Sequence, residues 1–321
     1  PAAWQSVSNG AERDRVRTGD RVRVRFDETQ PLPTYVVAFV VGDMKIETAT
    51  RAGRTMRMFH RENDAAKLAR NRDALFDLHA QAIEEVERYT GIPYPFGKFD
   101  FVLVPAFQPG AMEHAGNIAY KAESLLLDET ATQDELLDRA HVIAHETVHM
   151  WFGNLVTMRW FNDVWTKEVF ANFIADKIVA TQFPQMRHDL QFFLGNHGWA
   201  YAVDRSAGAN PIRQPLDNLG EAGSLYGPII YSKSPVVMRQ LEALLGETAF
   251  RDGVRAYLRR HAFGNATWDD LIAALAGSTK LDLKQWSHMW IDEPGRPVIR
   301  TALEVKDGRV QRLALQQRDP L

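Results

Sequence analysis

Apolar residues in the middle of the chain recur at helical spacing over long stretches. From residue 64 to residue 90 they fall close to one helix face, and Gly91-Ile92-Pro93 ends the pattern. Two further helices are predicted at 133–152 and 163–183, each closed by a glycine or a proline. Four shorter helical stretches are expected toward the end of the chain, at 236–245, 248–262, 268–276 and 283–290.

Strand patterns lie on both sides of the helical region and once within it. Residues 99–105 alternate between apolar and polar, which favours a strand, and the apolar run at 34–41 is typical of a buried strand. Similar patterns predict strands at 21–26, 45–50, 55–60 and 124–127, and a hairpin formed by 297–305 and 309–316. This order predicts an α+β fold, with a small mixed sheet beside a helical bundle and β strands at both ends.

The two ends of the chain carry few strands. Two or three strands cannot bury their own faces, so those at either end are expected to belong to larger β domains or to pack on the middle. Because the sequence opens on Pro1 without an apolar leader, its first residues are expected to be internal to a longer protein, and no signal peptide is visible. Cytoplasm and periplasm stay equally open as compartments, and no pattern predicts an oligomeric state.

The composition excludes several classes of site. Of 321 residues, 45% are apolar and 25% are charged, which is ordinary for about two globular domains. The net charge of −3 gives no support for a nucleic-acid partner, and no apolar run approaches the ~20 residues of a membrane span. The chain has no cysteine, so any metal must be held by His, Asp or Glu.

The strongest chemical signal is His145-Glu146-Thr147-Val148-His149, an HExxH sequence inside a predicted helix. Residues at positions i and i+4 lie one turn apart on the same helix face, so both imidazoles can reach one zinc ion. Glu146 is then aimed at a metal-bound water; two solvated histidines on a helix face are the alternative. A catalytic zinc takes a third protein ligand, for which Asp163, Glu168 and Asp176 compete.

Two more segments make the pattern specific. Gly110-Ala111-Met112-Glu113 precedes the HExxH sequence, Glu168 follows it after 18 residues, and Leu225 to Lys233 include Tyr231. Together they resemble the GxMEN motif, the third metal ligand and the catalytic tyrosine segment of the M1 family of zinc aminopeptidases, which are gluzincins. The resemblance covers about residues 30–295.

The resemblance implies a division of the chain into three parts. It predicts a thermolysin-like zinc metallopeptidase domain at 51–294, preceded by the end of an N-terminal β domain at 1–50 and followed by the start of a C-terminal β-sandwich at 295–321. In the family, the flanking domains complete the amine pocket and close the chamber around the peptide. The chain alone is therefore expected to bind zinc but to be a weaker and less selective exopeptidase than its parent.

The same resemblance assigns the chemistry. His145, His149 and Glu168 are expected to ligate one Zn²⁺ per chain. Glu146 is expected to act as the general base toward the attacking water, and Tyr231 to stabilise the oxyanion. The implied reaction is hydrolysis of the N-terminal peptide bond of peptides.

Glu113 is the residue that implies an exopeptidase. In the family, this carboxylate binds the free α-ammonium group of a peptide substrate, and the neighbouring Gly110, Ala111, Met112 and His114 are expected to contact the peptide. The alternatives are an endopeptidase or epoxide hydrolase of the same fold, and a non-catalytic zinc-binding module. An intact Glu113 argues against a pure endopeptidase.

Several positions depart from the family pattern. The fifth residue of GxMEN is His114 in place of Asn, and the usual Asn and Gly on either side of the third ligand are Lys167 and Val169. The acid expected seven residues after that ligand is replaced by Ala175, with Asp176 next to it. Because a helix rotates ~100° per residue, Asp176 is not expected to replace that acid in the same way.

Overall fold

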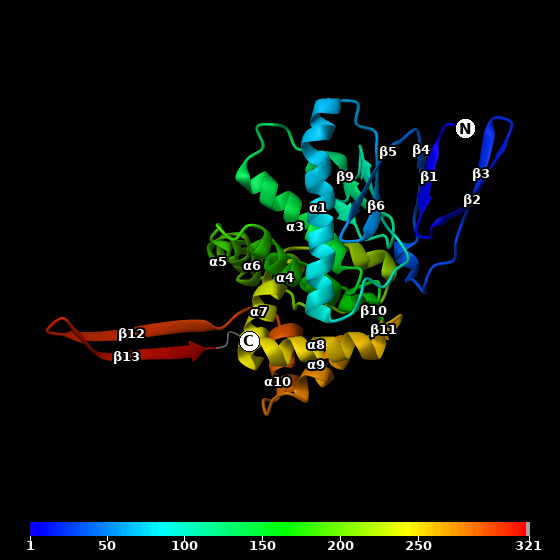
Figure 1. Cartoon of the computed structure of the whole chain (residues 1–321). Helices are drawn as coiled ribbons and strands as arrows, with labels where there is room; N and C mark the ends of the chain where they lie inside the picture. Colours follow the sequence, from blue (N-terminus) through cyan, green and yellow to red (C-terminus); the bar gives the residue numbers. More distant parts are fainter. Residues whose placement is uncertain (319–321) are drawn as a thin grey trace.

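The computed structural model describes residues 1–318 and is built around one five-stranded mixed sheet (Figure 1). The strands lie in the order β5 (Lys45–Arg51), β6 (Arg54–His60), β7 (Phe99–Val104), β9 (Ile118–Lys121) and β8 (Ala111–Met112). The three central strands are parallel, and β5 and β8 pair antiparallel at the two edges. The predicted strands at 45–50, 55–60 and 99–105 are confirmed, and β8 leaves one edge of the sheet available.

The long helix α1 (Ala65–Thr90) runs beside this sheet, as the cyan helix of Figure 1 shows. The Asp64 side chain begins the helix by accepting backbone N–H hydrogen bonds, and Gly91 ends it in the left-handed conformation at φ 64°. Against the sheet, the buried ring of His79 stacks on that of Phe101 with 4.2 Å between ring centroids. The helix predicted at 64–90 is confirmed.

The helices α3 (Gln133–Val148) and α4 (Val164–Gln182) pack on each other and carry most of the predicted site residues. Thr132 begins α3 with a capping box. The helix ends before the predicted residue 152 because a tight turn follows it. In that turn the backbone N–H of Asn154 donates to the carbonyl of His149 over 3.1 Å, and Gly153 adopts φ 125°.

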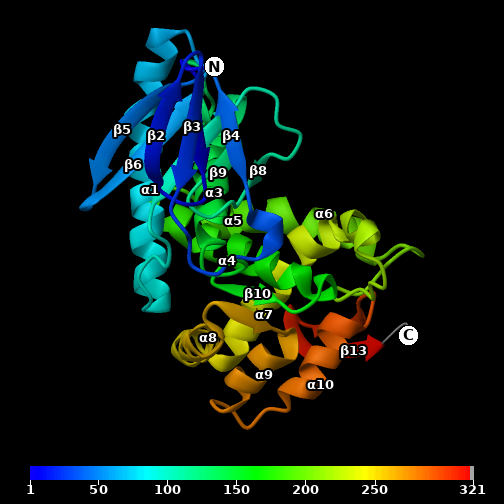
Figure 2. The same cartoon turned by 90° about the vertical axis from the view of Figure 1, so that its right-hand side faces the viewer.

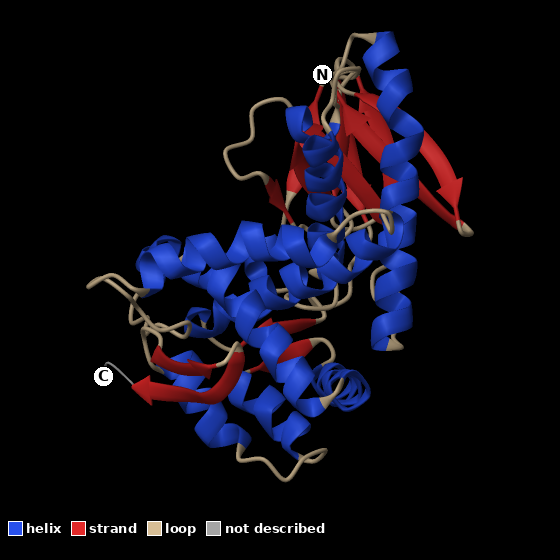
Figure 3. Ribbon diagram, turned by 90° about the vertical axis from the view of Figure 1, so that its left-hand side faces the viewer, coloured by secondary structure: helices blue, strands red, loops and turns tan. Residues whose placement is uncertain are grey.

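The rest of the middle region is helical, with one short pair of parallel strands (Figures 2 and 3). Its elements are β10 (Val156–Met158), α5 (His188–Phe192), η3 (Phe193–His197), α6 (Gly198–Asp204), η4 (Leu219–Leu225), η5 (Ile229–Lys233), α7 (Ser234–Leu245), α8 (Glu247–His261), β11 (Gly264–Ala266), α9 (Trp268–Ala276), α10 (Leu283–Ser287) and η6 (His288–Asp292). All four helices predicted after residue 235 are present. One buried apolar cluster runs from the sheet into these helices, so the α+β prediction is confirmed. Within the described residues, no helix has both the length and the apolar character that crossing a bilayer requires.

Pairs of antiparallel strands form both ends of the described chain. They are β1 (Gln5–Ser8) with β4 (Phe39–Gly42), β2 (Glu12–Thr18) with β3 (Arg21–Phe26), and β12 (Val298–Lys306) with β13 (Arg309–Arg318). The predicted strand at 21–26 and the predicted C-terminal hairpin are confirmed. In Figure 1 that hairpin projects away from the helices, and nearly all of its residues are exposed. The domain boundaries at 50 and 294 stay predictions.

The buried strand predicted at 34–41 is wrong. Residues Thr34–Val36 form the 3-10 helix η1, and extended structure begins only at β4. Asn9 interrupts the run, because its side-chain amide donates to the carbonyl of Val36 and accepts from the N–H of Ala38. Among the described strands β4 pairs with β1, and its Phe39 side chain is 76% exposed.

The short strand predicted at 124–127 is also wrong. The extended segment is the preceding β9, and the chain then turns into the helix α2 (Ala122–Leu125). Leu125 and Leu126 are buried by this turn rather than by a strand face. A short apolar run has the same pattern in a buried strand and in a short buried helix, so periodicity alone does not distinguish the two.

Candidate active site

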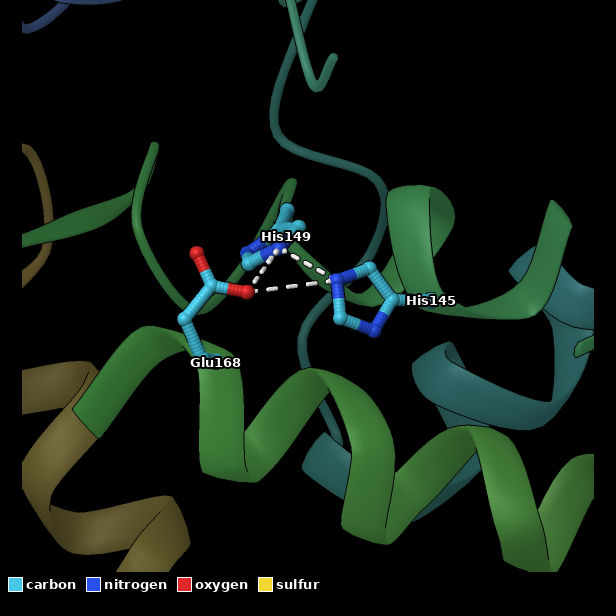
Figure 4. Close-up of side chains that lie close together, drawn as sticks. All are labelled: His145, His149 and Glu168. Carbon is cyan, nitrogen blue, oxygen red and sulfur yellow. Dashed lines mark hydrogen bonds and ion pairs between the residues drawn. The ribbon is translucent and has the colours of Figure 1, made fainter. Parts of the chain in front are cut away.

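Three predicted metal ligands converge between α3 and α4 (Figure 4). His145 lies in the last turn of α3, His149 lies at its C-cap, and Glu168 lies near the start of α4. The Nε2 atoms of the two imidazoles are 3.0 Å apart, and Oε2 of Glu168 is 3.4 Å from one and 3.6 Å from the other. Two imidazole nitrogens and one carboxylate oxygen facing one point form a donor set that suits zinc.

The opposite ring nitrogens fix the orientation of both imidazoles. Nδ1 of His145 donates to Oδ1 of Asn172 at 2.8 Å, and Nδ1 of His149 donates to the carbonyl of Phe152 at 3.0 Å. Because Nδ1 carries the proton in each ring, Nε2 keeps a lone pair directed at the common point. The sequence analysis did not find Asn172, although its position one turn after Glu168 places it on the same helix face.

The position that carries an acid in the family does not support the ligands here. Ala175 is fully buried. Asp176 lies beside His141, with 3.3 Å between Oδ1 and Nε2, and beside Arg239 at 3.5 Å. It therefore pairs with two groups other than His145 and His149, as the helical rotation predicts.

Glu146 is buried beside the three ligand candidates, and its Oε2 atom has no hydrogen-bond partner among the described residues. The pKa of Glu146 is raised to about 8, mainly by burial; the charges of Glu113 and Glu168 contribute to the rise, and His149 opposes it. An orphaned carboxylate oxygen at this place fits a site completed by a metal ion and its bound water. His145, His149 and Glu168, with Glu146 beside them, therefore fit the zinc ion that the HExxH sequence implies.

Glu113 follows the edge strand β8 and is buried close to the same cluster. Its Oε1 atom accepts from Nζ of Lys167 at 2.8 Å and from the hydroxyl of Tyr35 at 3.2 Å. Its backbone carbonyl accepts from the side-chain amide of Asn154 at 2.8 Å. Burial raises the pKa of this carboxyl, but the ammonium group of Lys167 outweighs that effect and lowers the pKa to about 2.

Lys167 joins the two carboxylates at the centre of the site. Its Nζ atom lies 2.8 Å from Glu113 and 2.5 Å from Glu168, and only 7% of its side chain is exposed. Burial lowers the pKa of Lys167, yet the two carboxylates raise it well above its ordinary value, so the side chain is a cation. From the sequence, this lysine is only a departure from the family pattern, and Tyr35 was not predicted as a site residue because it lies in the apolar run that indicated a buried strand.

The other residues predicted to contact substrate lie along and beside β8. Gly110 is exposed, Ala111 and Met112 are half-buried, and the N–H of His114 donates to the carbonyl of Met112 at 2.9 Å. Burial lowers the pKa of His114. The structure therefore brings the whole predicted segment to the sheet edge next to Glu113.

Tyr231 lies in η5, and its side chain faces a cavity of about 320 Å³ that is also lined by Asn172, His141 and Asp176. The residue is 38% exposed, and its ring stacks on that of Tyr226 with 6.1 Å between centroids. Burial and the charge of Glu168 raise the pKa of Tyr231, so the phenol keeps its proton at neutral pH.

Comparison with known proteins identifies the family. Residues 75–290 match the Peptidase family M1 domain. The chain is 33% identical over 302 residues to "Puromycin-sensitive aminopeptidase" of Caenorhabditis elegans, covering 94% of this chain and 31% of that protein. It is 33% identical to "Aminopeptidase N" of Streptomyces lividans, covering 100% and 37%, and 32% identical to "Tricorn protease-interacting factor F2" of Thermoplasma volcanium, covering 98% and 39%.

The chain spans roughly a third of the length of these relatives. The family match covers most of the helical region and includes the HExxH sequence, Glu113, Glu168 and Tyr231. The chain belongs to peptidase family M1.

Proposed function

We propose that the chain is the catalytic part of a zinc-dependent aminopeptidase that hydrolyses the first peptide bond of peptides. The observation that carries this proposal is the convergence of His145, His149 and Glu168 beside the orphaned oxygen of Glu146. The family and the names of the relatives support a peptidase. Zinc, when bound, would lower the pKa of its water to about 7 and polarise the substrate carbonyl.

Glu146 is the group that moves the proton in this proposal. Its carboxylate accepts a proton from the attacking water as a bond forms between the water oxygen and the carbonyl carbon of the substrate. It then delivers the proton to the amine nitrogen as the carbon–nitrogen bond breaks. The buried position of Glu146 beside the three ligand candidates, with an Oε2 atom that has no partner among the described residues, supports this role.

Tyr231 is proposed to stabilise the oxyanion. Its phenol is protonated at neutral pH and can donate a hydrogen bond to a negatively charged oxygen. Asn172, which accepts from the ring of His145, also donates to the backbone carbonyl of Tyr231, and the charge of Glu168 acts on the Tyr231 phenol, so this tyrosine lies close to the ligand candidates.

Glu113 and β8 are proposed to position the peptide. A peptide lying along the free edge of β8 can form backbone hydrogen bonds of the sheet type. A carboxylate at the end of that strand meets the first residue of the peptide, which is how the site would select the N-terminal bond.

Zinc content and two matched substrates test the proposal. The 321-residue chain is expected to bind one zinc and to hydrolyse leucine 4-nitroanilide faster than its N-acetylated form. Glu146→Gln is expected to keep the zinc and to lose at least a thousandfold in kcat, and Glu113→Ala to lose activity toward the free amine alone. A chain without zinc, or a Glu146→Gln variant of wild-type activity, would overturn the proposal.

A further inference from the structure

We propose that Lys167 is a specificity-determining residue that lowers the affinity of the site for a substrate's N-terminal ammonium group. The inference rests on the proposed function, because Glu113 is taken there as the group that receives this ammonium. Lys167 lies between Glu113 and Glu168. The family pattern has Asn at this position, so it predicts neither a positive charge there nor a role for one.

The geometry places an internal cation where the external one would bind. Oε1 of Glu113 already accepts from Nζ of Lys167 at 2.8 Å and from the hydroxyl of Tyr35 at 3.2 Å. An arriving ammonium group must displace the lysine or pair with the same carboxylate beside a like charge. Either route removes part of the free energy that an unoccupied buried carboxylate would contribute to binding.

Lys167 is held firmly in this position. Its ammonium group is anchored a second time by Glu168 at 2.5 Å, and its stem packs over Gly153. A Cβ atom on Gly153 would lie 3.3 Å from Cδ of Lys167 and 3.1 Å from the Tyr35 hydroxyl. The absence of a side chain at Gly153 makes room for the lysine stem, and the two carboxylates of Glu113 and Glu168 hold its ammonium group between them.

The consequence concerns the class of substrate. A site with a free Glu113 carboxylate gains strongly from a substrate ammonium and rejects peptides whose first nitrogen is acylated. With Lys167 in place, the two classes differ less in affinity. The chain is therefore inferred to accept N-terminally neutral peptides with a smaller penalty than the Glu113 motif alone implies.

Calorimetry on a non-hydrolysing protein tests this inference separately from catalysis. The zinc-loaded Glu146→Gln chain is titrated with leucinamide and with N-acetyl-leucinamide, and the same is done after adding Lys167→Gln. Leucinamide is expected to bind at least tenfold more tightly when Lys167 is removed, while N-acetyl-leucinamide changes less than twofold. Lys177→Gln is the matched control, because Lys177 lies on the same helix and pairs with Glu242 at 2.9 Å away from the site.

Two further variants keep the test decisive if Lys167→Gln folds poorly. Lys167→Arg keeps the cation and is expected to retain the weak binding of leucinamide, whereas Lys167→Met is expected to behave as Lys167→Gln does. In a Glu113→Gln background, removing Lys167 is expected to change leucinamide binding less than twofold. Unchanged or weaker leucinamide binding after neutral substitution of Lys167 would overturn the inference, even if hydrolysis and zinc binding meet expectation.

Discussion

Oδ1 of Asn172 accepts a hydrogen bond from Nδ1 of His145 over 2.8 Å. The amide nitrogen of the same asparagine donates to the backbone carbonyl of Tyr231 over 3.2 Å. One residue of α4 thus orients a ligand candidate and holds the segment that carries the proposed oxyanion donor. In this chain the support of the imidazole comes from an amide rather than from a carboxylate.

Removing Asn172 is expected to weaken metal binding. In Asn172→Ala the ring of His145 loses its oriented proton acceptor, and zinc affinity is expected to fall by roughly 10–100-fold. Competition with a chromogenic chelator measures the change. Asp176→Ala is the contrasting variant and should stay within twofold of wild type, because Asp176 contacts His141 and Arg239 instead. Equal losses in both variants would contradict the assignment.

Loss of the Tyr231 hydroxyl is expected to affect the chemical step. Tyr231→Phe keeps the ring that stacks on Tyr226 and is expected to lower kcat by about 10²–10³-fold with little change in KM. Steady-state kinetics with leucine 4-nitroanilide checks this. In Tyr226→Phe, kcat should change only a few-fold. A Tyr231→Phe enzyme with wild-type kcat would remove the tyrosine from the mechanism.

A side chain at Gly153 is expected to disturb both the fold and the site. Gly153 adopts φ 125°, and an added Cβ would press against Tyr35 and Lys167. Gly153→Ala is expected to cost about 1–3 kcal/mol of unfolding free energy. Thermal denaturation measures the loss, with Gly195→Ala as control, since no atom of residues 1–318, apart from the adjacent residues and the helix backbone, lies within 4 Å of a Cβ placed on Gly195. Equal melting temperatures for the two variants would show that the turn adapts without strain.

The buried His79 is expected to make folding stability depend on pH. Burial lowers its pKa to about 4 from an ordinary value of 6.5, so the unfolded chain takes up a proton first as the pH falls. The stability that His79 contributes is complete above pH 6.5 and is lost as the pH falls toward 4. Between pH 7.5 and pH 5 the loss is about 2 kcal/mol by linkage.

Urea denaturation of wild type and His79→Gln at several pH values tests this expectation. The variant cannot titrate at this position, so its unfolding free energy should fall less on acidification, whatever the cost of the lost ring stacking. Parallel pH curves for wild type and His79→Gln would exclude His79 as the cause.

The helices and the closeness of His145 to His149 were predictable because their signals are local. The HExxH spacing is set by one helical turn, and the apolar residues at 64–90 recur with the period of a helix over about seven turns' length of chain. The strand at 34–41 was predicted wrongly because the residue that interrupts this apolar run, Asn9, lies far away in sequence. Local pattern carries no information about such a contact.

The residues missed at the site have a similar explanation. Tyr35 reaches Glu113 from the N-terminal segment, a contact between residues 78 positions apart in the chain. Lys167 was visible as a departure, but its pairing with Glu113 depends on how β8 and α4 come together. Asn172 was predictable from helix geometry, since it lies one turn from Glu168, but the family pattern points to residue 175 as the support of the ligands.

Asn154 bears on the size of the fragment that the proposed aminopeptidase would release. Its backbone N–H is bonded to the carbonyl of His149, and its side-chain amide is bonded to the carbonyl of Glu113. One buried residue therefore connects His149, at the proposed metal site, with Glu113, the proposed ligand of the peptide's N-terminus. The two positions are held at a fixed separation. Asn154 would therefore fix the distance between the two positions. Under the proposed function, the folded protein rather than the peptide would set the size of the released fragment.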